Sequence, residues 1–264
     1  MRVGILGGAF NPPHIGHLVC AQEALRQLDL DEVVFVPVGH APHREIEEDP
    51  GAESRLEMVE LAIADDDRFA ASRIELDRDG PSYTSATLAE LRRRAPDDEL
   101  FLILGGDQAA ALARWHEPER VLELATVAVV ERVSWTRNAI GIKLFSLKGT
   151  ERVRYLDMPL MQVSSSAIRR RVRQGEPIRY FVPDEVVSYI LANGLYGAAA
   201  ASPAGAGSGD GSPGSANSAD ASASRKPAGD SSASTRSGGV SSASRAPGAD
   251  SSRSSPAEEA PASA

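Results

Sequence analysis

Short, continuous runs of apolar residues alternate with longer amphipathic segments along most of this chain. The runs lie at residues 3–6, 33–38, 100–104 and 127–130, with a weaker one at 153–156. Because the runs are continuous and do not alternate with polar residues, they predict strands buried on both faces, as in a parallel sheet.

The segments between these runs repeat their apolar residues every three or four positions, which is typical of helices that cover a core. Helices are expected at 15–28, 54–64, 84–94, 109–124, 165–173 and 183–192. Ser54 is a candidate N-cap, Pro183 suits a first-turn position, and Gly194 suits a C-terminal stop. Strands that alternate with helices predict an α/β fold with a Rossmann-like, doubly wound parallel sheet.

The composition changes abruptly near residue 198. Residues 198–264 are almost entirely Ala, Ser, Gly and Pro, and Val240 is their only large aliphatic residue. Such a segment cannot bury enough apolar surface to offset the entropy lost on ordering, so we expect a disordered C-terminal extension. Residues 1–197 are long enough for one domain with a substantial core.

Charge and cysteine content exclude several classes of protein. The net charge is −9, and the extension contributes little of it because it holds six acidic and five basic residues. An acidic domain argues against a general nucleic-acid binder. The single cysteine, Cys20, excludes a disulfide within the chain. No apolar run approaches the roughly 18 residues that span a membrane, so a soluble, cytoplasmic protein is expected.

Glycines follow three of the predicted strands. Gly7, Gly39 and Gly105 each come directly after an apolar run. In a doubly wound sheet, ligands bind at the carboxyl ends of the strands, so these glycines are expected to surround a nucleotide site.

The stretch 7–17 combines glycines, prolines and two histidines at the start of a predicted helix. Glycines let the backbone approach a ligand closely, and Pro12 supplies a stiff turn before the helix. His14 and His17 share a helix face, and each can donate a hydrogen bond to a phosphate oxygen. The alternatives are a capped helix with two surface histidines, or a zinc site, for which no third ligand is evident.

A second candidate anion site lies near the end of the domain. Ser164, Ser165 and Ser166 precede a predicted helix, and Arg169 follows one turn later. Hydroxyl groups and an arginine at a helix N-terminus suit an anion. Taken alone, the pattern also fits simple serine capping of a basic surface helix.

These two motifs resemble the signatures of the nucleotidyltransferase superfamily. The pattern Gly-x-Phe-x-Pro-x-His-x-Gly-His is matched by Gly8, Phe10, Pro12, His14, Gly16 and His17. Residues 163–169 are similar to Ile-Ser-Ser-Thr-x-Ile-Arg, with Val163 and Ser166 as conservative departures. The resemblance implies that His14, His17 and Arg169 are catalytic. It also implies that Ser165 and Arg169 hold the β- and γ-phosphates of ATP.

Further segments resemble the bacterial nicotinate-mononucleotide adenylyltransferases. Tyr83-Thr84 with Thr87-Leu88 is similar to their Tyr-Thr-x-x-Thr-Leu element, and residues 105–118 are similar to their Gly-x-Asp…Leu-x-x-Trp element. Segments 61–64 and 182–196 fit the same family, so the resemblance covers residues 1–197. Two departures are residues 133–135, where Pro-Gly is common, and His116, where an aromatic residue or Lys is common.

The resemblance implies two groups of binding residues. The ATP group is Gly7, Gly8, Ala9, Phe10, His14, Gly16, His17, Gly105, Asp107, Ser164, Ser165, Ile168 and Arg169, and the acceptor group is Arg44, Thr84, Asp107, Trp115 and His116. Trp115 offers a stacking surface, Asp107 suits ribose hydroxyls, and Arg44 can bind a phosphate through two bonds. A core aromatic residue, a helix N-cap and a solvated loop charge are the respective alternatives.

The expected reaction is adenylyl transfer from ATP to nicotinate mononucleotide, giving nicotinate adenine dinucleotide and pyrophosphate in NAD biosynthesis. Mg²⁺, held mainly by ATP phosphates and water, is the expected cofactor. The alternatives are another phosphorylated acceptor such as phosphopantetheine, or a non-catalytic nucleotide sensor. A Rossmann dehydrogenase is disfavoured because Gly-x-Gly-x-x-Gly is missing. The sequence leaves open the preference between nicotinate and nicotinamide mononucleotide, and the oligomeric state.

Overall fold

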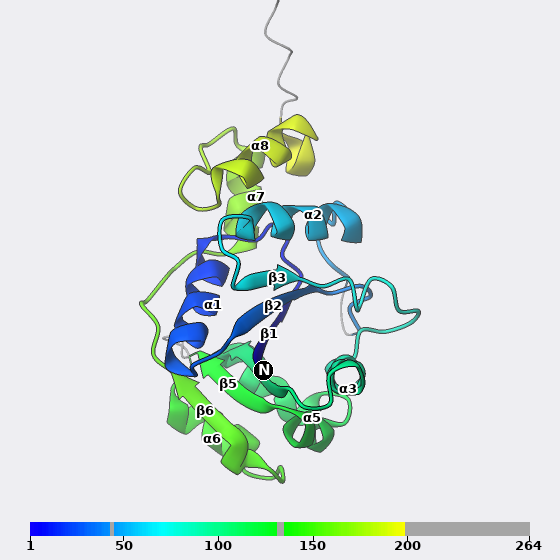
Figure 1. The fold of residues 1–264 in the computed structure, drawn as a ribbon. Helices are drawn as coiled ribbons and strands as arrows, with labels where there is room; N and C mark the ends of the chain where they lie inside the picture. The colour runs from blue at the N-terminus through cyan, green and yellow to red at the C-terminus, as the bar shows by residue number, and fades with distance from the viewer. Residues whose placement is uncertain (43–44, 131–134, 199–264) are drawn as a thin grey trace, which may run out of the picture. The chain divides into compact units, whose positions relative to one another are not determined.

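The computed structural model describes residues 1–42, 45–130 and 135–198. Within them, the strands form one parallel sheet in the order β3-β2-β1-β4-β5-β6 (Figure 1). The strands are β1 (Arg2–Gly8), β2 (Glu32–Pro37), β3 (Phe69–Ala71), β4 (Glu99–Gly105), β5 (Thr126–Val130) and β6 (Val153–Leu156). The chain starts at the centre, builds outward to β3, and then returns to build outward to β6. This is the doubly wound sheet that the sequence predicts.

All five apolar runs form strands, and the structure adds β3. This strand has only three residues, Phe69–Ala71, and none of them is fully buried. It is therefore too short and too exposed to appear in the sequence as an apolar run. Among the described strands it pairs only with β2, at the edge of the sheet. The extension predicted at 198–264 lies, apart from Ala198, outside the described residues.

The helices follow the prediction closely, with three corrections. They are α1 (Ile15–Gln27), α2 (Ala52–Ile63), α3 (Thr84–Arg94), α4 (Gly106–Ala111), α5 (Pro118–Leu124), α6 (Arg137–Leu144), α7 (Ser165–Arg173) and α8 (Asp184–Ala192), with 3-10 turns η1 (Leu112–Arg114), η2 (Thr150–Arg152) and η3 (Leu195–Gly197). The single helix predicted at 109–124 is wrong. Glu117 adopts a left-handed conformation and Pro118 starts a new helix, so the segment divides into α4, η1 and α5.

The other two corrections concern helix starts and a missed helix. Helix α2 starts after Gly51 and not at Ser54, and Pro183 is the N-cap of α8 and not a first-turn residue. Helix α6 was not predicted; its N-cap is Thr136, whose hydroxyl accepts a hydrogen bond from the amide of Ala139. Gly194 ends α8 with a φ of +59°, as its predicted role as a stop requires.

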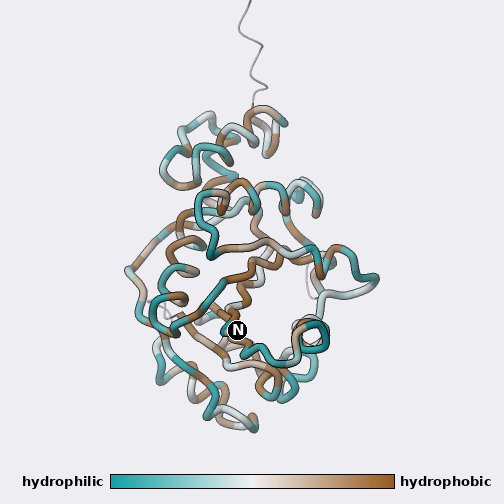
Figure 2. Tube along the Cα trace, viewed as in Figure 1, coloured by the Kyte–Doolittle hydropathy of each residue, from teal (hydrophilic) through white to brown (hydrophobic). Residues whose placement is uncertain are grey.

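Helices cover both faces of the sheet, so the sheet itself is the apolar centre of the molecule (Figure 2). Helices α1 and α2 pack with Leu6, Phe35 and Ile103 on one face. Helices α3, α4, α5 and α6 pack with Ile5, Leu102 and Val129 on the other. Because both faces are covered, continuous apolar strands are stable here.

A smaller cluster joins the end of the domain to α2. Met58 of α2 packs with residues of α7 and α8, including Ile168 and Ile190, and Figure 1 shows these helices gathered together. Helix α7 lies beside the turn that follows β1, because Ser165 donates its hydroxyl hydrogen to the carbonyl of Pro12. The segment after α7 is also joined to the start of α1, where Ile15 donates its amide hydrogen to the carbonyl of Phe181. Two motifs that are far apart in the sequence thereby become neighbours.

Candidate functional site

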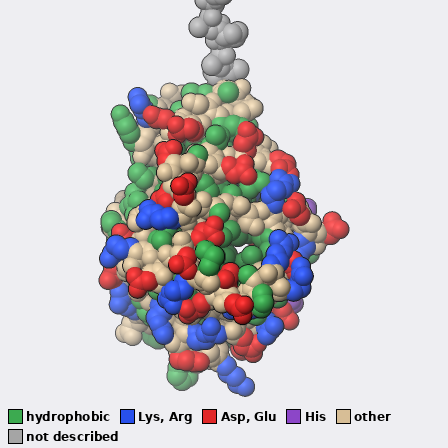
Figure 3. All heavy atoms as spheres, in the orientation of Figure 1, with side chains coloured by type: hydrophobic (Ala, Val, Ile, Leu, Met, Phe, Trp, Pro, Cys, Tyr) green, Lys and Arg blue, Asp and Glu red, His purple; other side chains and the backbone are tan. Residues whose placement is uncertain are grey.

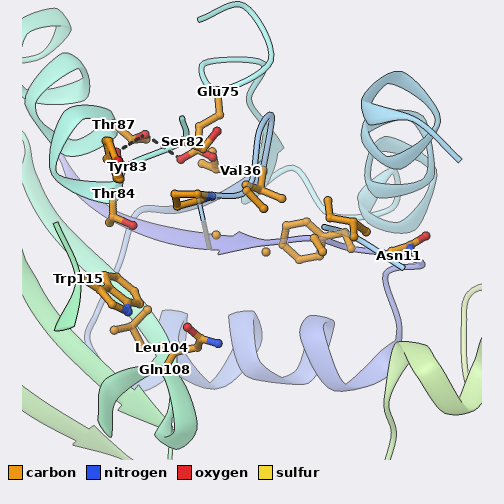
Figure 4. Close-up of a pocket in the computed structure, with 18 of the residues that line it drawn as sticks. Asn11, Val36, Glu75, Ser82, Tyr83, Thr84, Thr87, Leu104, Gln108 and Trp115 are labelled. Atoms are coloured by element: carbon orange, nitrogen blue, oxygen red, sulfur yellow. Dashed lines mark hydrogen bonds between the residues drawn. The ribbon is translucent and has the colours of Figure 1, made fainter. Parts of the chain in front are cut away.

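A cavity of about 880 Å³ lies at the carboxyl ends of the central strands. Its walls include Gly7 and Gly8 at the end of β1, Val36 of β2 and Leu104 of β4. Figure 4 shows Asn11 at one end of the cavity and Thr84 with Trp115 at the other. This is where the sequence predicted a nucleotide site.

The turn after β1 is held in a strained conformation by buried neighbours. Phe10 has a φ of +48°, which costs a non-glycine residue roughly 1–2 kcal/mol. The ring is 2% exposed and packs against Phe35, so its burial offsets that cost. Arg55 of α2, fully buried, donates to the carbonyl of Ala9 at 3.1 Å and pairs with Asp49. The sequence did not reveal this use of Arg55, because nothing in its helical pattern marks an inward-facing arginine.

The two histidines stack at the start of α1. Their ring centroids are 3.7 Å apart. The ring of Phe10 packs against the ring of His17 in a T-shaped arrangement and covers one side of it. His14 is the N-cap of α1, directly before the first helical residue, and it is 5% exposed. The amide of His14 donates to Nδ1 of His17 at 3.1 Å. A neutral His17 therefore carries its proton on Nε2, where it can be donated to a ligand.

Helix α7 closes the turn from its other side. Ser165 donates its hydroxyl hydrogen to the carbonyl of Pro12 at 2.8 Å, and Nη1 of Arg169 donates to the carbonyl of Asn11 at 3.0 Å. Both side chains line the cavity, and Arg169 is only 6% exposed. The motif after β1 and the motif at the start of α7 therefore meet at this end of the cavity.

Two carboxylates from the loop before α2 contact the buried arginine. Glu47 lies 3.3 Å from Nη2 of Arg169, and Glu48 lies 3.2 Å from Nε. Glu48 also pairs with Arg173 on the next turn of α7. Loop residues 45–49 therefore place negative charge where a phosphate group would need the guanidinium.

The other end of the cavity is built by α3 and by the segment after η1. Thr84 is the first residue of α3, whose N-cap, Tyr83, makes no side-chain capping bond. Trp115 lines the cavity while packing against the core, and its stacking role toward the acceptor stays a prediction. The ring of His116 stacks on Tyr83 with centroids 4.2 Å apart. An uncapped helix N-terminus beside an aromatic ring suits a planar ligand that carries an anion.

A buried acid, Glu75, lies behind α3 in the cavity wall. It accepts a hydrogen bond from the hydroxyl of Thr87 at 2.7 Å (Figure 4). Burial raises the pKa of the Glu75 carboxyl, although hydrogen bonds from Thr87 and Ser82 act in the opposite direction. Glu75 was not predicted as a site residue, because a single acid in a loop of mixed charge has no distinguishing pattern.

Several residues predicted for the site lie off the cavity wall. They are His14, Gly16, Gly105, Asp107, Ser164 and Ile168. Ile168 is fully buried in the cluster of α7 and α8, and Ser164 is the N-cap of α7, accepting from the amide of Ala167. Asp107 is exposed in the first turn of α4, whose N-cap is Gly105. Arg44 lies outside the described residues.

Comparisons with known proteins agree with this geometry. The model of the cytidylyltransferase-like family matches residues 5–171. A protein of Thermus thermophilus, "Probable nicotinate-nucleotide adenylyltransferase", is 43% identical over 196 residues, which are 74% of this chain and all of the relative. One of the same name from Rubrobacter xylanophilus is 40% identical over 206 residues, covering 78% of this chain and 96% of the relative.

This chain belongs to the nicotinate-nucleotide adenylyltransferase family.

Solved structures support the fold of this adenylyltransferase. Two structures of the Plasmodium falciparum nicotinic acid mononucleotide adenylyltransferase, one complexed with NaAD and one with APC, match with TM-scores of 0.62 and 0.61. They cover 74% of this chain and 97% and 96% of the Plasmodium chains, at 17% identity. The arrangement of the sheet is therefore shared although most side chains differ.

Three further observations concern the described part of this adenylyltransferase. No helix there is long and apolar enough to cross a membrane. No group of three or more His, Cys, Asp or Glu side chains there is placed to hold a metal ion. Acidic and basic side chains are interspersed on the face shown in Figure 3.

Proposed function

We propose that this chain transfers the adenylyl group of ATP to nicotinate mononucleotide, releasing pyrophosphate and forming nicotinate adenine dinucleotide. The proposal rests chiefly on one observation: a single cavity is lined by His17, Arg169 and Thr84. The first two suit a triphosphate, and the third lies at a helix N-terminus that suits a carboxylate. Membership of the nicotinate-nucleotide adenylyltransferase family supports the same reaction.

The proposed chemistry needs no covalent enzyme intermediate. A phosphate oxygen of the mononucleotide attacks the α-phosphorus of ATP in line. The bond from the α-phosphorus to the bridging oxygen breaks, and pyrophosphate leaves with the electron pair. Because the attacking phosphate is already an anion at neutral pH, no general base is required. Catalysis then consists of positioning and charge stabilisation.

We assign the charge stabilisation to both ends of the domain. His17 donates its Nε2 hydrogen to an oxygen of the reacting phosphates, since its Nδ1 is occupied by the amide of His14. Gly7 lets the backbone approach the ligand, because no other atom lies within 4 Å of where its Cβ would be. Ser165 and Arg169 orient the leaving pyrophosphate. Arg169 must exchange Glu47 and Glu48 for phosphate oxygens to do so.

Nucleotidyltransferases of this kind generally use a divalent metal ion. We propose Mg²⁺, held chiefly by ATP phosphates and water, because the described residues supply no cluster of three ligands. Bound in this way, the ion would neutralise charge on the phosphate oxygens.

The acceptor is assigned to the end of the cavity formed by α3 and Trp115. The nicotinate ring stacks on Trp115, and its carboxylate faces the first-turn amides of α3, which no N-cap side chain occupies. The positive end of the helix dipole favours this carboxylate over the neutral amide of nicotinamide mononucleotide. The proposal therefore includes a preference for the nicotinate form.

Pyrophosphate release from ATP tests the proposal directly. Purified protein is assayed with nicotinate mononucleotide, nicotinamide mononucleotide and phosphopantetheine, each with Mg²⁺. We expect the highest kcat/KM with the nicotinate form and no release without an acceptor. Equal or faster release with phosphopantetheine, or ATP binding with no release from any acceptor, would refute the assignment.

The His17→Ala variant tests the proposed catalytic residue. We expect kcat to fall by about 100-fold or more, as is usual when a donor to developing charge is removed. His40→Ala is the matched control, because it removes an exposed imidazole at the end of β2. Circular dichroism and thermal unfolding check that both variants fold. Normal turnover in a folded His17→Ala protein would remove this residue from the mechanism.

A further inference from the structure

Glu75 is a buried ionisable group that the proposed chemistry leaves without a role. It is 8% exposed and lines the cavity from a loop between β3 and α3. An isolated buried carboxyl group is costly, so one that is kept in a cavity wall needs compensating donors. Those donors identify what Glu75 holds in place.

The hydroxyl of Thr87 is committed to Glu75. Nη2 of Arg78 donates to Oγ1 of Thr87 at 3.0 Å, so this oxygen already serves as an acceptor. Oγ1 of Thr87 lies 2.7 Å from Oε1 of Glu75 and 3.3 Å from the carbonyl oxygen of Tyr83, and its hydrogen can be donated to either. The shorter, charge-assisted bond takes the hydrogen. Glu75 thus holds the first turn of α3 in place through the hydroxyl of Thr87.

Ser82 provides a second link through the same reasoning. Its Oγ accepts hydrogen bonds from the amides of Gly39, at 3.2 Å, and His40, at 3.1 Å. A hydroxyl that accepts twice has one hydrogen left to donate, and its partner here is the Glu75 carboxylate. Glu75 therefore joins the residues after β2 to the start of α3.

The two hydroxyl partners of Glu75 flank the acceptor element. Tyr83 and Thr84 lie between Ser82 and Thr87 in the sequence, and Figure 4 shows the four residues grouped with Glu75 beside the cavity. We propose that Glu75 is a positioning residue that sets the place of Tyr83 and Thr84 and thereby determines acceptor affinity. This inference rests on the proposed function, because it assigns the acceptor to that end of the cavity.

The donor arrangement makes a specific demand on residue 75. All its partners donate, so the residue must only accept, as a carboxylate does. A glutamine has nearly the same shape, but its amide group would place hydrogens against at least one donor. Glu75→Gln is therefore expected to disturb α3 with little change in packing volume.

The test separates the two substrates. In Glu75→Gln, KM for nicotinate mononucleotide should rise about tenfold, the size expected for loss of one charge-assisted hydrogen bond, while KM for ATP changes less than about twofold. Thr87→Val should reproduce this split, and Thr87→Ser, which keeps the hydroxyl, should restore near-normal values. Ser85→Ala is the matched control. It removes a buried hydroxyl from the same turn, one with no partner within the described residues.

The outcomes are distinguishable from failure of the proposed function. A wild-type protein that releases no pyrophosphate with nicotinate mononucleotide would overturn both. An active wild type with unchanged acceptor KM in folded Glu75→Gln and Thr87→Val proteins would overturn only the role of Glu75. Equal rises in both KM values would also overturn it, since they would indicate a general structural effect. If Glu75→Gln does not fold, the Thr87→Val and Thr87→Ser pair decides alone.

Discussion

Gly39 shows how a single missing side chain shapes the acceptor end of the site. A Cβ at this position would lie 2.2 Å from the carbonyl oxygen of Glu75 and 2.9 Å from its carbonyl carbon. Both contacts are to backbone, so no side-chain rotation relieves them. The close approach of two backbone segments brings the Gly39 amide to Ser82. Glycine is required here for space and not for an unusual dihedral angle.

Gly39→Ala should therefore destabilise the domain by about 2 kcal/mol or more, since the backbone must move to admit the methyl group. Gly141→Ala is the matched control, because nothing lies within 4 Å of a Cβ there and the position is inside α6. That change should stabilise the domain by roughly 0.5–1 kcal/mol. Urea unfolding of the two variants measures both effects. A Gly39→Ala protein as stable as the wild type would contradict the contact.

At the scale of elements, the loop before α2 and helix α7 form a pair with opposite charges. Glu47 and Glu48 contact Arg169, and Glu48 also contacts Arg173. An ATP phosphate and these carboxylates cannot use the same guanidinium donors at the same time. The loop therefore competes with the substrate that the site is proposed to bind.

Replacing both carboxylates, as in Glu47→Gln with Glu48→Gln, should lower KM for ATP by about threefold to tenfold, because a competing charge-assisted contact is removed. Glu45→Gln is the control: Glu45 lines the same cavity but forms no ion pair with Arg169. Initial rates over a range of ATP concentrations give the comparison. A double variant with a higher KM would mean that the loop supports ATP binding.

Elements with strong patterns were predictable, and those that depend on distant partners were not. The strands of the sheet core, α1, α3 and α7 follow from periodicity because burial on one or both faces dictates their residues. Strand β3 has too few residues to form a pattern, and it exists because β2 offers it an edge. The site motifs 7–17 and 164–169 were recognisable because the phosphate binding predicted for them restricts residue types. Arg55, Glu75 and Glu48 were not, since their partners are set only by the folded chain.

For the molecule as a whole, the adenylyltransferase relatives define which part of the chain should be sufficient. The Thermus thermophilus relative is matched along its full length by 196 residues of this chain. The cavity and every contact described for it fall before residue 199. Composition predicts that residues 198–264 contribute no packed core.

A protein that ends at Ala198 should keep its KM values and kcat within about twofold of the full chain, because no described cavity residue is lost. Its melting temperature should change by less than about 2 °C, since each kcal/mol corresponds to only a few degrees in a domain of this size. Parallel assays and thermal unfolding of both proteins provide the check. A marked loss of activity or of melting temperature in the shortened protein would assign the extension a role in the domain.

The central position of β1 has a consequence for how this protein is made. Strand β1 needs β2 on one edge and β4 on the other, and β4 begins only at Glu99, long after β1 has left the ribosome. During that interval the nascent chain presents an apolar strand with an open edge, a form prone to mispairing. The turn after β1 acquires its contact with Arg169 later still, because the two bonded residues are 158 positions apart in the sequence. Every translation product released before α7 would therefore carry the histidine motif without the arginine that completes it.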